Sequence, residues 1–226
     1  MPETSKPNAS TRTGGEQGKR QTIERVLAAA RREFASKGLD RARIDDIARE
    51  AGVTKQLVYH YYHSKDALFC AVLDQASADV LAGLSTLAVE HLTPPEAMRA
   101  LVGSMFDQYR DDRTLGTLAQ EGIRYHEDHE TPHNKLPDVA PALLSKLEGI
   151  FANGVARGDF RSDVDLRLFL ATSALLTSGA FTNRYLLSIM AGFDTTSPEG
   201  VVQWRNYAIE FMLSSVLSSG HDGVGR

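Results

Sequence analysis

Side chains that commonly contact nucleic acid gather on one short stretch after Thr54. Lys55, Gln56 and His60 are polar, and at 100° per residue Gln56 and His60 lie nearly opposite the apolar Val58 of a helix. Glutamine can form two hydrogen bonds with adenine, and lysine binds guanine edges or phosphate. Histidine donates to phosphate oxygens, as tyrosine does. The chemistry that these residue types favour is non-covalent recognition of double-stranded DNA.

Two short helices would have to position these side chains. The first carries apolar residues spaced i, i+3, i+4 and i+7, which share one face: Ile44, Ile47, Ala48 and Ala51. Gly52 ends that helix, because glycine adopts a left-handed helix stop without a Cβ clash. Thr54 can cap the second helix through its hydroxyl, and Val58 with Tyr62 marks the inward side. So short a glycine turn between two helices indicates a helix-turn-helix, whose second helix enters the DNA major groove.

A lysine stands at the start of the next expected helix. Ser64 would cap that helix, and Lys65 follows it directly. The helix dipole favours anions rather than cations at this end, so the sequence predicts a DNA phosphate near Lys65.

Three motifs carry a resemblance to a known family: D-I-A-R-E-A-G-V-T-K, Y-H-Y-Y and S-K-D-A-L, in this order. Together they resemble the DNA-binding region of TetR-type transcriptional regulators. The resemblance implies base contacts at five positions, Lys55, Gln56, Leu57, Tyr59 and His60. It implies phosphate contacts at three others, Thr54, Tyr61 and Lys65.

The sequence departs from the family pattern at two places. A small hydroxyl residue commonly opens the first helix of the motif, whereas Ala42 and Arg43 stand there. No side-chain cap is therefore expected, and Arg43 becomes a further candidate for a phosphate contact. Leu57 replaces a residue that is often small or polar, which limits it to an apolar contact such as one with a thymine methyl group.

Composition excludes several classes of protein from the expected answer. The 226 residues are 42% hydrophobic, enough to bury a full core without disulfides or metal. No apolar run approaches 18 residues and the first residues are polar, so we expect no membrane span, no signal peptide and a cytoplasmic location. The single cysteine, Cys70, cannot form an internal disulfide.

Charge is divided unevenly along the chain. Residues 1–69 carry 13 Lys+Arg and 9 Asp+Glu, whereas the remainder carries 12 and 20. A basic head on an acidic body would steer one end toward a polyanion. Ordinary scatter of charges over solvated helices explains the same numbers, so the asymmetry only supports the motif.

The apolar pattern predicts an all-α chain with a three-helix helix-turn-helix head and a larger helical effector-binding and dimerisation domain. We expect a disordered basic arm over 1–20, the head over 21–66, the effector domain over 67–218 and a flexible tail over 219–226. The arm could follow DNA or only aid solubility. Expected helices run over 22–38, 44–51, 55–62, 65–84, about 93–109, about 114–128, about 141–158, about 164–191 and about 197–220. We expect the apolar 164–191 segment to be one helix, capped by Ser162 or Asp163 and buried on several sides.

The resemblance further implies a homodimer formed by the last two helices of each subunit. A two-fold pair of recognition helices reads two half-sites of a near-palindromic operator. The function that this implies is a repressor that a small-molecule effector releases from DNA. Two apolar helices at the end of a chain could equally cover the body's own core.

The effector site is the least defined part of the sequence. Polar and aromatic residues on the middle helices are the candidates: Gln108, Tyr109, Glu121, Arg124, Tyr125, His126, Asn183 and Arg184. Each could instead form a structural hydrogen bond within the helical core. The arginines permit an anionic effector without indicating one.

Two alternatives to an effector-released repressor remain, a metal-responsive regulator and an enzyme. His126, His129 and His133 could bind a divalent metal on an unbroken helix, but Pro132 interrupts it and the segment is polar enough to be a solvated loop. An enzyme with an incidental DNA-binding head is the other alternative. The chain contains no phosphate-binding glycine loop, no G-x-S-x-G and no H-E-x-x-H, so we expect no enzymatic activity and no cofactor.

Overall fold

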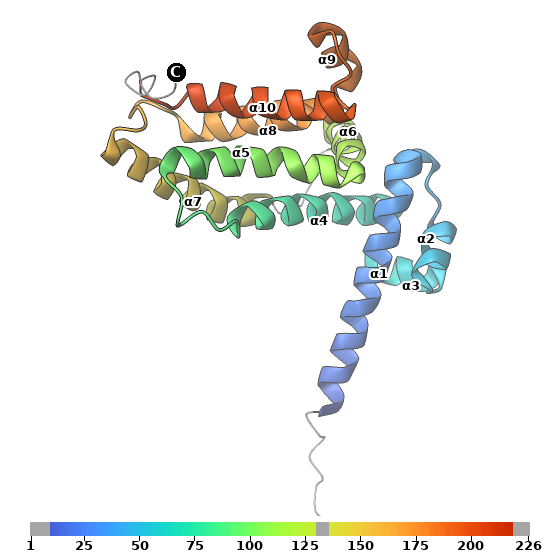
Figure 1. Cartoon of the computed structure of the whole chain (residues 1–226). Coiled ribbons are helices and arrows are strands. Elements are labelled where there is room, and N and C mark those ends of the chain that lie inside the picture. Colours follow the sequence, from blue (N-terminus) through green and yellow to red (C-terminus); the bar gives the residue numbers. More distant parts are fainter. Residues whose placement is uncertain (1–9, 130–135, 219–226) are drawn as a thin grey trace, which may run out of the picture. The chain divides into compact units, whose positions relative to one another are not determined.

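The computed structural model describes residues 10–129 and 136–218, and the chain divides into two compact units, Met1–Leu73 and Asp74–Arg226 (Figure 1). Every regular element in the described ranges is a helix, and one isolated bridge pairs Phe160 with Leu217. The expected all-α class is confirmed. The sequence placed the boundary at residue 66, whereas the units divide after Leu73, inside a continuous helix, α4 (Lys65–Ser85).

The first unit, here called the head, contains three complete helices: α1 (Ser10–Arg41), α2 (Ile44–Ala51) and α3 (Lys55–Tyr62). Their inward faces, with the start of α4, form one apolar core. Phe34 of α1 and Phe69 of α4 are fully buried, and their rings meet edge to face with centroids 5.1 Å apart. The core also holds Val26, Ala30, Ile47, Val58 and Leu68.

Helix α1 begins earlier than expected. It starts at Ser10, so residues 10–20, which we expected to be disordered, are helical; residues 1–9 lie outside the described ranges. Once a helix is nucleated by packing, each further residue adds a backbone hydrogen bond at little cost, so a polar sequence can extend it. Gly38 interrupts the helix with φ 72°, at the stop that the sequence predicted.

The second unit, here called the body, contains the rest of α4 and six further helices: α5 (Pro94–Asp111), α6 (Arg113–Asp128), α7 (Leu136–Arg157), α8 (Leu166–Thr182), α9 (Arg184–Ala191) and α10 (Pro198–Ser214). Helix α5 packs against α7, α8 and α10 (Figure 1). Met98 and Phe106 of α5 and Met212 of α10 are buried in the core between these helices.

Two helix starts follow the sequence signals closely. The backbone N–H and the hydroxyl of Thr93 both donate to Glu96 Oε2, at 2.9 and 2.7 Å, at the start of α5. At the start of α10, Ser197 Oγ accepts from the Gly200 N–H at 3.0 Å. Both helices begin where the sequence predicts them, at about residues 93 and 197.

The long apolar segment differs from its prediction. It forms two helices, because α8 ends at Thr182 and α9 begins at Arg184 on the other side of Asn183. Burial on several sides is also wrong: no residue of α9 is buried, and Leu175 of α8 is 69% exposed. A high apolar content reports that a surface avoids water but does not say which surface covers it.

The caps and ends of three body helices also differ from expectation. Asp165, not Ser162 or Asp163, caps α8, since its Oδ1 accepts from the Arg167 and Leu168 N–H groups at 2.9 and 3.1 Å. Helix α7 begins at Leu136 and holds Pro141 within it, so the proline did not mark the start. Helix α10 ends at Ser214, and the expected end, residue 220, lies outside the described residues.

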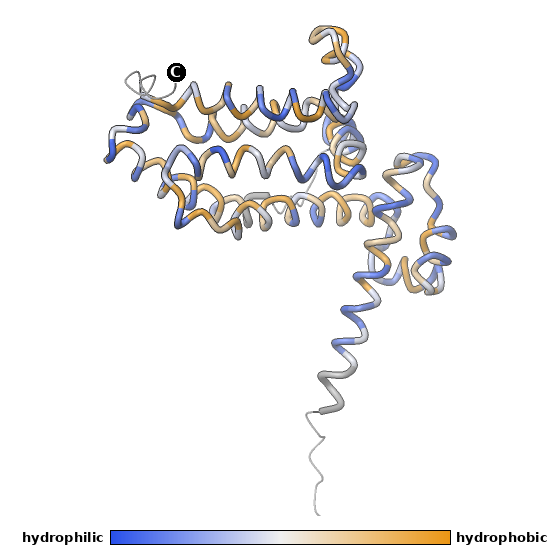
Figure 2. Tube along the Cα trace, in the orientation of Figure 1, coloured by the Kyte–Doolittle hydropathy of each residue, from blue (hydrophilic) through white to orange (hydrophobic). Residues whose placement is uncertain are grey.

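Helix α4 is long and apolar enough, by length and composition, to cross a bilayer, which the sequence analysis did not expect. A helix that contributes to protein cores meets the same criteria. Leu68 and Phe69 of α4 are buried in the head, and Leu84 is buried in the body. Figure 2 shows the apolar residues that run along it.

Candidate nucleic-acid interface and ligand cavity

Helix α3 presents the polar side chains that the sequence singled out. Thr54 Oγ1 accepts from the Leu57 N–H at 3.2 Å, which satisfies one of the free donors at the helix start. Val58 is 1% exposed and anchors the opposite side in the head core. The solvent-facing side carries Lys55, Gln56, Tyr59 and His60, which we call the α3 outer face. All four residues are exposed, so this face is open to a ligand as large as a duplex.

The other predicted contact residues of α3 lie at the edge of this face. Leu57 and Tyr61 are half-buried. The Tyr61 ring lies beside that of His60, with centroids 5.5 Å apart, and Lys19 Nζ of α1 is 6.0 Å from its centre. Lys19 therefore adds a positive charge near Tyr61, a feature that the sequence motif did not indicate.

Lys55 is held in place by a carboxylate of α2. Its Nζ donates to Asp45 Oδ2 at 2.9 Å, and this hydrogen bond raises the pKa of Lys55 above its usual value. Both side chains are about half exposed, so the pair is weak and Lys55 can exchange Asp45 for a phosphate or base at little cost.

A glutamate of α1 binds the backbone at the start of α2. Arg43 occupies the N-cap position without a side-chain cap, and its backbone N–H donates to Glu33 Oε1 at 3.1 Å. Glu33 is only 7% exposed and also accepts from Lys37 Nζ at 2.8 Å. The Arg43 residue is exposed, so its guanidinium stays available to solvent and ligands. Glu33 thus satisfies the N–H of the N-cap residue itself. The Asp46 N–H in the first turn, which an N-cap hydroxyl could accept, donates to the Arg43 carbonyl oxygen at 3.1 Å.

Lys37 links α1 to the start of α2. Besides Glu33, its Nζ donates to Asp46 Oδ2 at 3.1 Å. Hydrogen bonding to Lys37 holds the pKa of Asp46 below its usual value, which keeps this carboxylate charged near the positive end of α2.

Lys65 has protein partners where the sequence predicted a phosphate. Its Nζ donates to the carbonyl oxygens at the end of α1, those of Leu39 at 2.7 Å, Asp40 at 3.1 Å and Ala42 at 3.5 Å. Ser64 caps α4 as expected, accepting from the Ala67 N–H at 2.9 Å. The ammonium therefore joins the end of α1 to the start of α4, which accounts for a cation at this helix start.

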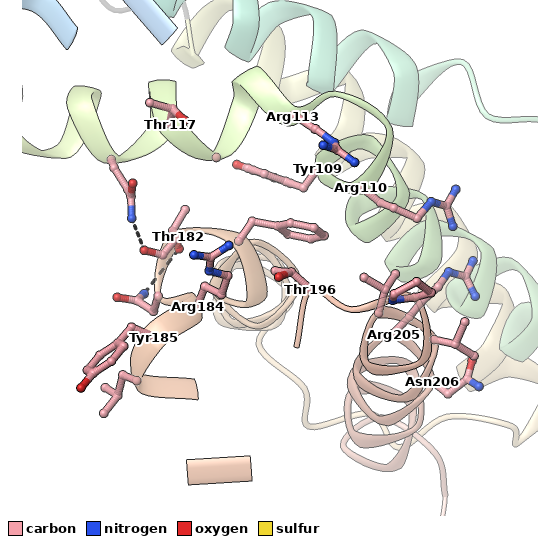
Figure 3. Close-up of a pocket in the computed structure, with 18 residues that line it drawn as sticks. Tyr109, Arg110, Arg113, Thr117, Thr182, Arg184, Tyr185, Thr196, Arg205 and Asn206 are labelled. Atoms are coloured by element: carbon pink, nitrogen blue, oxygen red, sulfur yellow. Dashed lines mark hydrogen bonds between the residues drawn. The ribbon is translucent and has the colours of Figure 1, made fainter. Parts of the chain in front are cut away.

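The body contains a cavity of about 1310 Å³ between α5, α6, α8, α9 and α10 (Figure 3). Three of the eight predicted effector residues line it: Tyr109, Asn183 and Arg184. The other five do not line it: Gln108, Glu121, Arg124, Tyr125 and His126.

Those five residues have other surroundings. Arg124 pairs with Glu121 at 3.3 Å, and the Tyr125 ring stacks on His129 with centroids 4.3 Å apart. Gln108 lies against Gly83 of α4, and its buried Nε2 has no hydrogen-bond partner among the described residues. A structural role within the helices therefore fits the paired residues on α6 better than a role in this cavity.

Sequence analysis missed most of the cavity's polar lining. Arg110, Arg113 and Arg205 line it, as does Phe181. These residues come from four different helices, so no spacing along the chain connects them. Only the neighbouring Arg110 and Arg113, at the junction of α5 and α6, could have been found from sequence as a local concentration of positive charge.

The histidine cluster gains no support as a metal site. His133 lies outside the described residues, and within the described ranges no group of three metal-ligating side chains comes together. His129 Nδ1 lies 3.0 Å from the Tyr125 carbonyl oxygen, and its ring is engaged by the Tyr125 ring.

Two family models match the chain on either side of this division. Residues 26–72 match the description "Bacterial regulatory proteins, tetR family", and residues 94–212 match "Tetracyclin repressor-like, C-terminal domain". The chain belongs to the TetR family. It is accordingly a DNA-binding transcriptional regulator with a ligand-responsive C-terminal domain, and the resemblance of the three motifs is confirmed.

Named relatives agree with this placement. The HTH-type transcriptional repressor NicS of Pseudomonas putida is 26% identical over 85% of this chain and 91% of its own length. The fatty acid metabolism regulator protein of Bacillus subtilis is 21% identical over 66% of this chain and 76% of its own.

Solved structures show the same fold. The regulator SCO4942 from Streptomyces coelicolor matches with a TM-score of 0.62 at 22% identity, covering 86% of this chain and 98% of that one. The regulator FadR from Bacillus subtilis, solved in complex with stearoyl-CoA, matches with a TM-score of 0.59 at 19% identity, covering 84% and 97%.

Proposed function

We propose that the protein is a homodimeric transcriptional repressor that binds a near-palindromic DNA operator and is released by a small-molecule effector. The observation that carries this proposal is the α3 outer face, which is polar and exposed on a helix whose other side is anchored by Val58. A capped helix of this kind, following a glycine turn, is the element that enters a major groove. Such a regulator acts in the cytoplasm, where the DNA is.

In this proposal, the residues divide by role. Gln56, Tyr59 and His60 face base edges together with Lys55, and Leu57 makes an apolar contact at the rim. Thr54, Tyr61 and Arg43 contact phosphates. Because the ammonium of Lys65 is occupied by three carbonyls, we assign it the structural role of holding α1 against α4.

The exposed faces of α8 and α10 support the dimer. They leave five large apolar side chains at least half exposed: Leu168, Leu175, Val202, Tyr207 and Phe211. Monomeric proteins rarely expose so many large apolar groups on neighbouring helices, whereas homodimer interfaces are rich in them. A second copy of the chain would cover both faces at once by two-fold symmetry.

Helix α4 offers a route from effector to DNA. It is one continuous helix whose first residues belong to the head core and whose later residues belong to the body core. An effector that shifts α4 within the body would move the head and change the separation of the two recognition helices. FadR from Bacillus subtilis, with its bound stearoyl-CoA, is a structural neighbour that holds a small molecule.

Fluorescence anisotropy with mixed-sequence duplexes tests the proposal. We expect binding at low ionic strength whose affinity falls steeply with added salt, because several phosphates release their counterions. A protein that binds no duplex at low ionic strength would refute the proposed function.

A further inference from the structure

The cavity in the body has a strongly positive lining. Four of its lining residues are arginines, Arg110, Arg113, Arg184 and Arg205, and none is an aspartate or glutamate. The body as a whole has an excess of acidic residues, so this local balance is opposite to that of its surroundings. Such a concentration of one charge attracts anions.

Two of the four arginines are neutralised by carboxylates from α5. Arg205 forms a two-pronged pair with Asp107, with both N–O distances 2.8 Å. Arg110 pairs with Asp107 at 2.6 Å and with Asp111 at 2.7 Å. These two guanidinium groups line the cavity, but the carboxylates of Asp107 and Asp111 compensate their charge.

The other two arginines have no ion pair among the described residues. Arg113 and Arg184 are both exposed, and no carboxylate of residues 10–129 or 136–218 forms an ion pair with either within 4.0 Å. Asp194 senses Arg184, but its low pKa is caused mainly by the N–H and hydroxyl of Thr196, which donate to its Oδ1 at 2.9 and 2.8 Å. The charges of Arg113 and Arg184 are therefore available to pair with an anionic ligand.

The position of Arg184 adds a second indication of an anion. Arg113 is the first residue of α6 and Arg184 is the first residue of α9. A helix dipole favours an anion at this end. At α6 that anion is Asp112, whose Oδ1 accepts from the Thr114 N–H at 2.8 Å, whereas α9 has no side-chain cap. Asn183, at the N-cap of α9, also lines the cavity and makes no side-chain cap, so the first N–H groups of α9 have no side-chain acceptor from it.

Aromatic rings form an apolar wall in the same cavity. Tyr109 of α5 and Phe181 of α8 stack with centroids 6.0 Å apart and planes 18° apart. Burial raises the pKa of Tyr109 above its usual value, so its hydroxyl stays protonated and can donate a hydrogen bond at neutral pH. In Figure 3, Tyr109 and Arg113 lie on one side of the cavity, and Arg184 lies with Thr182 on another.

We propose that this cavity binds an organic anion with a flat apolar body. Arg113 and Arg184 pair with its acidic group, and the stacked rings of Tyr109 and Phe181 pack against its body. This inference rests on the proposed function, because the anion would be the effector that the repressor responds to.

Fluorescence titration of the full-length protein with two related probes tests the inference. 8-Anilinonaphthalene-1-sulfonate carries a negative charge, and N-phenyl-1-naphthylamine has the same rings without it. We expect the Arg113→Gln/Arg184→Gln double variant to lose about tenfold or more in affinity for the anionic probe, since two charge-assisted hydrogen bonds are lost. Affinity for the neutral probe should stay within about twofold, because the aromatic wall is intact.

Two further variants make the comparison secure. Arg124→Gln removes the same charge from α6 outside the cavity and should leave both affinities unchanged. Arg184→Gln alone, at an exposed position, should give a partial loss if the double variant folds poorly.

Three results would overturn the inference. They are an unchanged affinity of the double variant for the anionic probe, an equal loss for both probes, or a loss that accompanies a change in oligomeric mass. The last result would mean that the arginines pair with a second subunit. Duplex binding by the same proteins separates this inference from the proposed function. If the protein binds DNA but shows no preference for the anionic probe, only the cavity inference fails; the reverse result refutes only the repressor.

Discussion

Two solvent-facing surfaces of this protein differ in chemistry, although both are formed by helices with one buried side. The α3 outer face of the head is polar, with Gln56 and His60 exposed. The outward faces of α8 and α10 in the body are apolar, with Leu175 69% and Phe211 50% exposed. A polar face can wait in water for a polyanion, whereas an apolar face is stable only when another apolar face covers it. The α3 outer face therefore suits a partner that binds and dissociates, whereas the apolar faces of α8 and α10 suit a partner that stays bound.

The largest effect is expected when charge is placed on the apolar surface of α8 and α10. Leu175→Glu/Phe211→Glu should convert the proposed dimer into monomers, because two carboxylates per subunit would be buried without partners. A monomer reads one half-site, so affinity for the selected operator should fall by about 100-fold, or about 2.7 kcal/mol. Sedimentation equilibrium and DNA titration measure the two effects.

The matched control is Ile123→Glu on α6. Ile123 is 58% exposed and belongs to α6, which carries none of the five apolar side chains of the proposed interface, so this variant should keep the wild-type mass and affinity. A double variant that still sediments as a dimer would show that α8 and α10 do not form the interface.

The polar surface is tested by removing one recognition side chain at a time. Gln56→Ala or His60→Ala should change the preference among operator variants by about 1–3 kcal/mol, the value of a good base contact. His91→Ala removes an exposed imidazole from the body and should change nothing. If both head variants lose affinity equally on every duplex, their side chains contact the backbone rather than the bases.

The same contrast explains what the sequence could predict. The α2 and α3 helices, the glycine turn between them and the outward residues of α3 were predicted, because they lie within 25 consecutive positions and each depends on its near neighbours. Their contacts with DNA stay a prediction. Even so, the acceptor for the Arg43 N–H, Glu33, comes from α1 and follows no local rule. The start of α1 was missed because a packed helix can extend into a polar sequence without an apolar stripe.

The body was predicted only in its helix positions. The apolar 164–191 segment was expected to be buried, but much of it is exposed. Composition alone cannot distinguish a helix of the chain's own core from one whose apolar face a partner covers. The cavity joins residues as distant as Tyr109 and Arg205, so three of eight candidates were found and the arginines of α5, α6 and α10 were not. Such a site is set by tertiary packing rather than by a motif.

The support under the polar surface gives a smaller effect. Glu33→Ala should lower the free energy of unfolding of the head by about 1–3 kcal/mol, because the Arg43 N–H and Lys37 both lose their acceptor. Urea unfolding followed by hydrogen exchange of α2 measures it. Glu24→Ala removes only an exposed partner 3.9 Å from Arg20 and should stay within about 0.5 kcal/mol. Equal losses in both variants would show that Glu33 does not stabilise the start of α2.

The smallest effect on DNA binding is expected at Lys65. Lys65→Met should destabilise the head by about 1–2 kcal/mol through the lost carbonyl contacts. It should leave the slope of log affinity against log salt unchanged, because a group without a phosphate contact releases no counterion. A slope that falls by about one unit would instead restore the phosphate contact that the sequence predicted.

The central claim is that two copies of α3 read DNA together, and selection from a random duplex library with the full-length protein tests it most directly. We predict enrichment of two inverted half-sites whose centres are separated by about one helical turn or a multiple of it. Enrichment of a single asymmetric site, or of no sequence at all, would contradict the account.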